Sequence, residues 1–311
     1  MNWKTKALIQ NSISRLPEPF ADAIYFYMQR GFGGLKNVNM KEHFTNVAEF
    51  LQYLAKQNRT IVDATCLEIG TGRRLNVPLG LWLCGAKKIY TVDLNTYVNE
   101  NLVVESLAYL RQNLPELKAI WGEWAQTEIF EQRLEELLNC QPNLKSVLAL
   151  TQIEYRAPID ARTLPFAAHS IDYYLSVSVF EHIPPPLLKA ILQEAKRVLT
   201  KGGLSLHIID PSDHFSHADE SICSVNFLQY YERQWQKLAG NKFAYHNRLR
   251  VYDYLVLFDE TGLKTLEQKR YINARSVAAL QNGFHLNEKF HGRAVEELAT
   301  NRLDVVGTFA S

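Results

Sequence analysis

The sequence is poor in cysteine and has no long apolar run. Its four cysteines, Cys66, Cys84, Cys140 and Cys223, are scattered over 311 residues, with neither the density of a disulfide scaffold nor the paired spacing of a zinc site. The richest apolar stretch, residues 78–85, is far shorter than the roughly 20 residues that a membrane-spanning helix requires. We therefore expect reduced thiols and no membrane span.

The chain also lacks an excess of charge of one sign. Its 34 Lys and Arg against 33 Asp and Glu give a formal net charge of +1, so no basic surplus indicates a nucleic-acid partner. The first 20 residues alternate apolar and polar side chains, without the continuous apolar segment and cleavage site of a signal peptide. These absences predict a cytoplasmic globular protein that does not bind nucleic acid.

Short apolar runs alternate with helical stretches from Thr65 onward. Runs of this length suit strands that are buried on both faces of a parallel sheet. The alternation predicts a doubly wound α/β fold. The expected strands include 65–69, 89–93, 153–159, 171–177 and 204–209, and the expected helices include 77–84, 99–112 and 185–199.

Three segments lie outside this minimal pattern. Residues 1–60 are predicted to be a helical N-terminal cap, interrupted by the glycine-rich turn at 31–34, and residues 61–311 the main domain. An insertion at about 121–150 is expected to be additional helix. A second, at about 212–250, is rich in Tyr, Phe, Trp and His and is our candidate substrate lid, although most of its aromatic residues would serve equally well in a helix core.

The strongest local signal is the string LEIGTG at 67–72, where the first strand meets the following helix. Ligands bind at this edge of open α/β sheets, and Gly70 and Gly72 allow a ligand to approach the main chain closely. Asp93 ends the second strand 21 positions after Gly72, where an acid can accept hydrogen bonds from ribose hydroxyls. Leu75 stands where a dinucleotide-binding loop has its third glycine, which disfavours a pyrophosphate site.

Four motifs between residues 65 and 209 together resemble the class I S-adenosylmethionine-dependent methyltransferases, with a core of the methyltransferase type 11 kind: E-x-G-x-G, the acid ending the next strand, D-A-x-x-L-P-F at 160–166 and F-E-H-I at 180–183. The resemblance implies a Rossmann-like doubly wound seven-stranded sheet that is mostly parallel and has an antiparallel last strand. It also implies that S-adenosylmethionine is the cofactor. It places Gly70 and Gly72 at the methionine end, Asp93 at the ribose and Asp160 at the adenine amino group. The cofactor-binding residues that it predicts are Glu68, Gly70, Thr71, Gly72, Asp93, Leu94, Asp160, Ala161 and Ser176.

Two arginines follow the second glycine, and histidines gather after the fifth strand. Arg73 or Arg74 could meet the cofactor carboxylate, or could begin a solvent-facing helix. If the acceptor is a hydroxyl, a base is required, and histidine is the usual choice near neutral pH. The candidate bases are His214, His217 and His182. The predicted site contains no metal ligand, although a divalent cation or plain solvation remain alternatives for Asp210, Asp213, His214 and His217.

These features predict an enzyme that methylates an oxygen or nitrogen atom of a small molecule or a glycan precursor. The glycan option comes from RGFGGLKN at 30–37 and DHFSH at 213–217, which resemble segments of methyltransferase-like proteins with bacterial surface-glycan functions. Two alternatives stay open: a non-catalytic module that binds an adenosyl ligand, and a nicotinamide-dependent oxidoreductase, which Leu75 disfavours.

Overall fold

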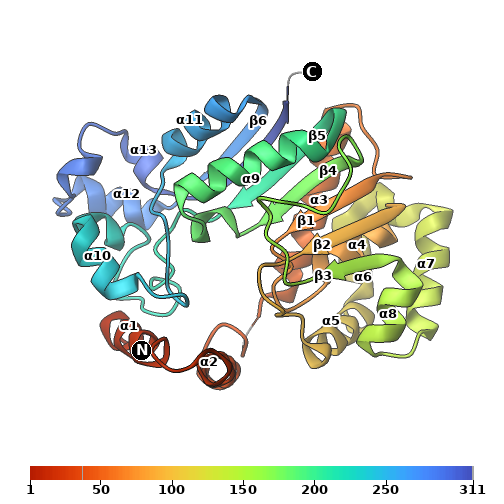
Figure 1. Cartoon of the computed structure of the whole chain (residues 1–311), viewed down its shortest axis with the longest axis horizontal. Coiled ribbons are helices and arrows are strands. Elements are labelled where there is room, and N and C mark those ends of the chain that lie inside the picture. Colours follow the sequence, from red (N-terminus) through yellow and green to blue (C-terminus); the bar gives the residue numbers. More distant parts are fainter. Residues whose placement is uncertain (37, 310–311) are drawn as a thin grey trace.

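Seven strands form one sheet in the order β3-β2-β1-β4-β5-β7-β6 in the computed structural model, which describes residues 1–36 and 38–309 (Figure 1). Strand β7 is antiparallel to β5 and β6, whereas the pairs among β1 to β5 are parallel. This arrangement confirms the predicted fold class. The strands are β1 (Thr65–Ile69), β2 (Lys88–Val92), β3 (Ile153–Arg156), β4 (Ile171–Val177), β5 (Leu199–Ile209), β6 (Leu263–Ile272) and β7 (Thr300–Phe309).

Helices connect the strands and begin or end at recognisable local signals. Asn39 and Asn99 accept a backbone N–H from the first turn of the helices that follow them, Pro185 opens another helix, and Gly262 ends one with φ of 79°. The α-helices are α1 (Trp3–Ile13), α2 (Glu18–Phe32), α3 (Met40–Lys56), α4 (Asn76–Leu83), α5 (Glu100–Gln112), α6 (Leu114–Trp121), α7 (Glu128–Asn139), α8 (Leu144–Thr151), α9 (Pro185–Val198), α10 (Glu232–Ala239), α11 (Val251–Thr261), α12 (Ala274–Gln281) and α13 (Val295–Leu298).

The central strands of the sheet are buried on both faces, as their continuous apolar sequences require, whereas the edge strand β6 is largely exposed. Along β1, Cys66 contributes to one hydrophobic cluster and Leu67 to the other, because successive side chains point to opposite faces. The first cluster includes apolar residues of α3 to α8, and the second packs α9 and α11 against the sheet (Figure 1). The two layers hold the carboxyl ends of the parallel strands in fixed positions.

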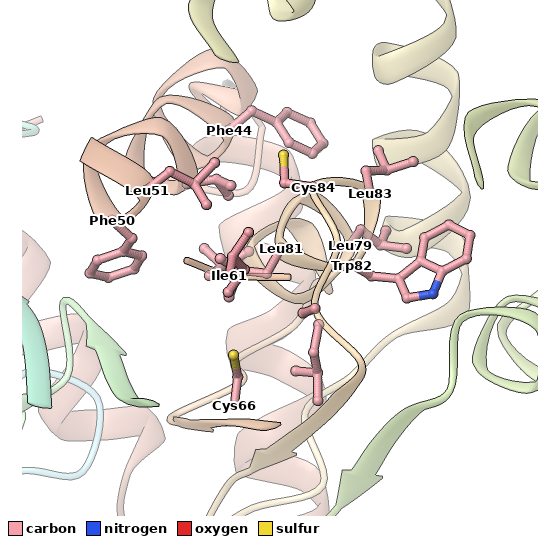
Figure 2. Close-up of a cluster of buried hydrophobic side chains, with 14 of the residues drawn as sticks. Phe44, Phe50, Leu51, Ile61, Cys66, Leu79, Leu81, Trp82, Leu83 and Cys84 are labelled. Carbon is pink, nitrogen blue, oxygen red and sulfur yellow. The ribbon is translucent and has the colours of Figure 1, made fainter. Parts of the chain in front are cut away.

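Helix α4 is buried along its whole length between the sheet and its neighbours. Figure 2 shows its Leu81 and Leu83 among the side chains of α3 and β1. A Cβ atom at Gly80 would lie 2.7 Å from Val47 Cγ2 of α3, so glycine allows these two helices to approach closely. This packing fixes the helix that follows the glycine loop.

The described residues before β1 contain helices α1, α2 and α3, which pack in two different places. Helix α3 belongs to the layer beside α4 and α6. Helix α1 instead packs against α10, and its Trp3 shares a third hydrophobic cluster with Phe227 and Trp235 of the aromatic-rich insertion. Figure 1 shows α1 and α2 beside this insertion, apart from α3. Among the described residues, no helix is long and apolar enough to cross a membrane.

Candidate functional site

The loop between β1 and α4 is tied to the end of β2 by one carboxylate. Asp93 Oδ2 accepts the backbone N–H of Gly72 at 2.9 Å, and its Oδ1 accepts that of Asn95 at 2.9 Å. Gly70 has φ of +82°, and a Cβ there would lie 2.4 Å from Val179 Cγ2. Gly72 has φ of +64° with open space around its missing side chain. Gly70 therefore needs to be glycine both for its conformation and for its closeness to Val179, whereas Gly72 is favoured by conformation alone.

A cavity of about 710 Å³ opens at this edge of the sheet, and we call it the glycine-loop cavity. Its volume lies within the range of small-molecule sites, roughly 300–1,000 Å³. Six of the predicted cofactor-binding residues line it: Gly70, Gly72, Asp93, Leu94, Asp160 and Ala161. Glu68, Thr71 and Ser176 are not among its lining residues.

Glu68 lies behind the loop in a buried chain of hydroxyl groups. Thr91 Oγ1 donates to Glu68 Oε2 at 2.5 Å and lies 2.6 Å from Thr71 Oγ1. Burial raises the pKa of Glu68 to about 8, despite the hydrogen bond from Thr91, which lowers it. The carboxyl group is therefore protonated at neutral pH. Its hydrogen bond with Thr91 lies within the protein core and does not reach the cavity.

The carboxylate of Asp160 faces the cavity and is held by a neighbour. Arg162 donates to it through Nε, at 3.0 Å to both oxygens, and through Nη2 at 2.5 Å. Hydrogen bonds from Arg162 hold the pKa of Asp160 below its usual value. Asp160 is therefore ionised and its carboxylate is held in one orientation. This is the residue for which the resemblance predicted a contact with the adenine amino group.

The two arginines after the second glycine have different surroundings. Arg73 lines the glycine-loop cavity, and its guanidinium lies 4.9 Å from the ring centre of Phe26 and 4.8 Å from that of Tyr97. This cation–π sandwich joins α2 to the rim of the cavity. A ligand carboxylate at this rim would meet a cation already fixed in position.

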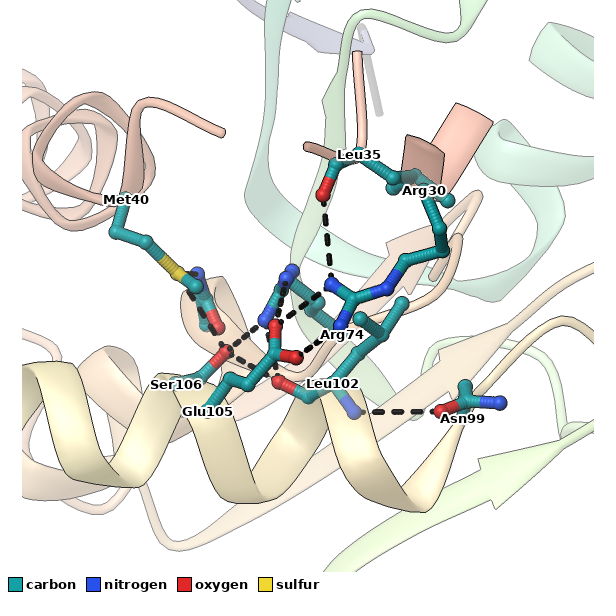
Figure 3. A network of polar contacts seen from close by, with 9 residues as sticks. Arg30, Leu35, Met40, Arg74, Asn99, Leu102, Glu105 and Ser106 are labelled. Atoms are coloured by element: carbon teal, nitrogen blue, oxygen red, sulfur yellow. Dashed lines mark hydrogen bonds and ion pairs between the residues drawn. The ribbon is translucent and has the colours of Figure 1, made fainter. Parts of the chain in front are cut away.

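Arg74 is a structural residue, buried in the polar network of Figure 3. It donates to the backbone oxygen of Leu102 at 2.5 Å and to Glu105 Oε2 at 2.8 Å. Arg30 of α2 donates to the same carboxylate at 2.6 Å and 3.1 Å. The network therefore ties α2, α5 and the glycine loop together, and Arg74 is neither solvent-facing nor among the cavity-lining residues.

A second cavity of about 570 Å³ adjoins the first, and we call it the histidine cavity. Tyr25, His182 and Phe243 line both cavities, and the rings of Tyr25 and Phe243 stack with centres 4.1 Å apart. One wall comes from α1 and α2, and the other from the segments after β4 and β5 and from the 212–250 insertion. The insertion predicted as a lid thus contributes to this cavity together with the N-terminal helices.

The predicted bases His182, His214 and His217 all line the histidine cavity. Asp210 Oδ2 lies 3.2 Å from His214 Nε2 and 3.5 Å from His217 Nε2. Burial raises the pKa of Asp210, but the hydrogen bond and charge of His214 outweigh it and hold the pKa well below the usual value. Desolvation by the surrounding side chains lowers the pKa of His182 to about 4 and also lowers that of His217, although His182 keeps part of its surface exposed.

Two other polar residues of this region are structural. His207 lies within β5 between Ser176 Oγ, at 2.8 Å, and Ser205 Oγ, at 2.6 Å, so both of its ring nitrogens are satisfied in the core. Asp213 accepts from Asn226 Nδ2 at 2.9 Å and is buried. The structure therefore assigns Asp213 to holding the insertion.

The structure adds His246 to the site, a residue that the sequence did not single out. It is buried in the loop before α11, and its ring centre lies 4.0 Å from that of His214 and 4.7 Å from that of His182. No spacing signal links three histidines from three separate segments. They come together because the end of the insertion returns to the segment after β4, where Asn247 Nδ2 donates to the backbone oxygens of Phe180 and Ile183.

One family model matches part of this chain. Residues 112–206 match the family model described as a methyltransferase domain, which confirms the resemblance predicted from the motifs. The matched range includes Asp160, Ala161, Ser176 and His182 and leaves out the glycine loop. A search of curated proteins finds no match.

Similar solved structures share little sequence with this chain. One is geranyl diphosphate C-methyltransferase from Streptomyces coelicolor A3(2), with 11% identity, a TM-score of 0.44, and coverage of 84% of this chain and 77% of that one. Two more are the [4+2]-cyclase SpnF, with 13% identity, a TM-score of 0.43 and coverage of 85% and 81%, and YcgJ from Bacillus subtilis, with 12% identity, a TM-score of 0.41 and coverage of 85% and 99%. The fold assignment rests on the strand order itself.

Proposed function

We propose that this chain, which carries a methyltransferase domain of the class I fold, transfers a methyl group from S-adenosylmethionine to an oxygen or nitrogen atom of a small molecule or glycan precursor. The observation that best supports this proposal is the pair of adjoining cavities. One is lined by the glycine loop, Asp93 and Asp160, and the other by histidines. The first suits a nucleoside-containing methyl donor and the second an acceptor.

The glycine-loop cavity offers matching groups to the parts of S-adenosylmethionine. An ionised carboxylate has about four acceptor positions, and the amides of Gly72 and Asn95 occupy two of those of Asp93. The remaining two can accept the ribose hydroxyls. Asp160 would accept the adenine amino group beside Ala161, and Arg73 would meet the methionine carboxylate. Glu68, Thr71 and Ser176 do not line the cavity and would support the cofactor-binding loop from behind.

To catalyse methyl transfer, the protein has mainly to position the methyl donor and the acceptor and to exclude water. The sulfonium already activates the methyl group, which transfers in line to a nucleophile held about 3 Å away. For a hydroxyl acceptor, a bond forms between oxygen and methyl carbon while the sulfur–methyl bond breaks, and its electron pair stays on sulfur. The hydroxyl proton passes to His217, whose lowered pKa keeps the ring neutral and whose Nε2 lies beside Asp210.

The cofactor assignment is tested by calorimetric titration with S-adenosylhomocysteine. Asp93→Ala should weaken binding, because it removes the ribose acceptors and releases the Gly72 amide, and Gly70→Val should weaken it sterically. Asp259→Ala, which changes an exposed acid of α11, should bind as the native protein does. Unchanged affinity in both site variants would contradict the assignment.

The acceptor side is tested with labelled methyl donor and a panel of hydroxylated and amine-bearing small molecules and glycan precursors. His217→Ala should lower the rate of product formation by about 100-fold or more, the usual size of general-base catalysis, while S-adenosylhomocysteine affinity stays unchanged. Binding of S-adenosylhomocysteine without transfer to any acceptor would favour the non-catalytic binding module instead.

A further inference from the structure

Three histidines from separate segments bring their ring nitrogens together at the boundary of the two cavities. One nitrogen from each of His182, His214 and His246 lies within 4.8 Å of the others. His182 ends the short 3₁₀ helix after β4, His214 follows β5, and His246 precedes α11. Three strong donors thus converge on one point from three directions.

Hydrogen bonds to the backbone leave the far nitrogen of two of these rings free. Nδ1 of His182 lies 3.1 Å from the backbone oxygen of Tyr245, and Nδ1 of His246 lies 2.8 Å from that of Ala244. A carbonyl oxygen only accepts, so each Nδ1 carries the proton and each Nε2 presents its lone pair. Nε2 of His246 is buried and has no hydrogen-bond partner among the described residues.

The third ring has the carboxylate partner that metal-bound histidines commonly have. Asp210 Oδ2 lies 3.2 Å from His214 Nε2, so Nδ1 is the nitrogen of this ring that is left to bind an ion. Carboxylates and backbone carbonyls behind ligating histidines orient the rings and raise their basicity. All three histidines therefore have an outer partner of this kind.

We propose that His182, His214 and His246 bind one divalent transition-metal ion of the zinc, cobalt or nickel class. Imidazole nitrogen suits these ions, whereas magnesium and calcium prefer oxygen ligands. Zinc–nitrogen bonds of about 2.0–2.1 Å place tetrahedral ligands roughly 3.4 Å apart, which small side-chain rotations reach from the observed spacing. Three protein ligands leave a fourth position open, as in catalytic zinc sites.

The open position gives the ion a role, and this part of the inference rests on the proposed function. All three histidines line the histidine cavity and His182 also lines the glycine-loop cavity, so the ion lies between the two. An acceptor with a hydroxyl oxygen would bind it there. Coordination lowers the pKa of the hydroxyl, its proton passes to His217, and the oxygen attacks the methyl carbon as described above.

The test uses the full chain, freed of metal by a chelator and titrated with Zn²⁺ by calorimetry and with Co²⁺ by visible absorption. We expect one ion per chain and the absorption bands of a four- or five-coordinate Co²⁺ site. His214→Ala and His246→Ala should each weaken Zn²⁺ binding by more than the about 10–100-fold that Asp210→Asn, the loss of an outer partner, should cost. His285→Ala, which removes an exposed histidine outside the group, should bind as the native chain does.

S-adenosylhomocysteine affinity separates a lost metal site from a lost fold or a wrong cofactor assignment. His214→Ala should bind S-adenosylhomocysteine normally without binding Zn²⁺, and Asp93→Ala should do the reverse. If the native chain binds neither Zn²⁺ nor Co²⁺, the inference is wrong. It is also wrong if His214→Ala binds them as tightly as the native chain, a result that does not depend on whether the variant of buried His246 folds.

Discussion

Glu68→Gln should change how the stability of this protein depends on pH. The glutamine has nearly the same shape and keeps an oxygen that can accept from Thr91 Oγ1, but it cannot ionise. Burial raises the pKa of Glu68 to about 8 from its ordinary value of 4.5. The native protein therefore keeps a proton on this group over a pH range in which the unfolded chain has already lost it.

The size of the effect follows from this difference in proton binding. The stabilising contribution of the protonated group is complete below pH 4.5 and is lost as the pH rises through about 8. Between these values the free energy of unfolding of the native protein should fall by up to about 1.4 kcal/mol for each pH unit. The glutamine variant should lack this component.

The assay is urea unfolding of both proteins at several pH values between 5 and 9. The stability of the native protein minus that of Glu68→Gln should decrease with rising pH and level off above about pH 8. Glu154→Gln provides a control, because Arg156 holds the pKa of Glu154 below its usual value, so its contribution should be constant over this range. Parallel curves for the native protein and Glu68→Gln would refute the protonated, buried state of Glu68.

Two further predictions concern the backbone around the site. Gly70→Ala should destabilise the fold by about 1–3 kcal/mol, because its Cβ would overlap Val179 at 2.4 Å, whereas Gly72→Ala should cost only about 1 kcal/mol of backbone strain; equal urea midpoints would contradict the difference. Arg250→Met should cost a few kcal/mol, since the buried guanidinium donates to the backbone oxygen of Pro211 and an unpaired buried carbonyl costs about 1–3 kcal/mol. Thermal unfolding with an unchanged midpoint would show that this contact is dispensable.

The central strands could be predicted because they are apolar on both faces, and β1 and β4 have the predicted bounds. β5 begins at Leu199 instead of 204. Gly202 and Gly203, which lie between the predicted helix 185–199 and the predicted strand 204–209, belong to the strand, where the pairing of β4 with β5 shifts register and Gly202 has φ of +76°. A β-bulge uses the same residues as a turn, so the local sequence does not distinguish the two.

The two sides of the site differ in how far the sequence predicts them. The glycine loop and Asp93 lie at the ends of adjacent strands, so a local motif and one spacing place them together. His246 reaches the site only because the end of the insertion is hydrogen-bonded to the segment after β4, and Tyr25 only because α2 lines the same cavity. Such contacts between distant segments leave no periodic signal in a single sequence.

Ligand-dependent thermal unfolding of the native chain tests the central claim most directly, with S-adenosylmethionine, S-adenosylhomocysteine and reduced nicotinamide cofactor compared in parallel. A ligand present at about 100 times its dissociation constant stabilises the folded state by roughly 2.7 kcal/mol, which shifts the midpoint visibly. We predict that the two adenosyl-sulfur ligands raise the midpoint and the nicotinamide cofactor does not. A shift with the nicotinamide cofactor alone, or with none of the three, would contradict the assignment of the glycine-loop cavity.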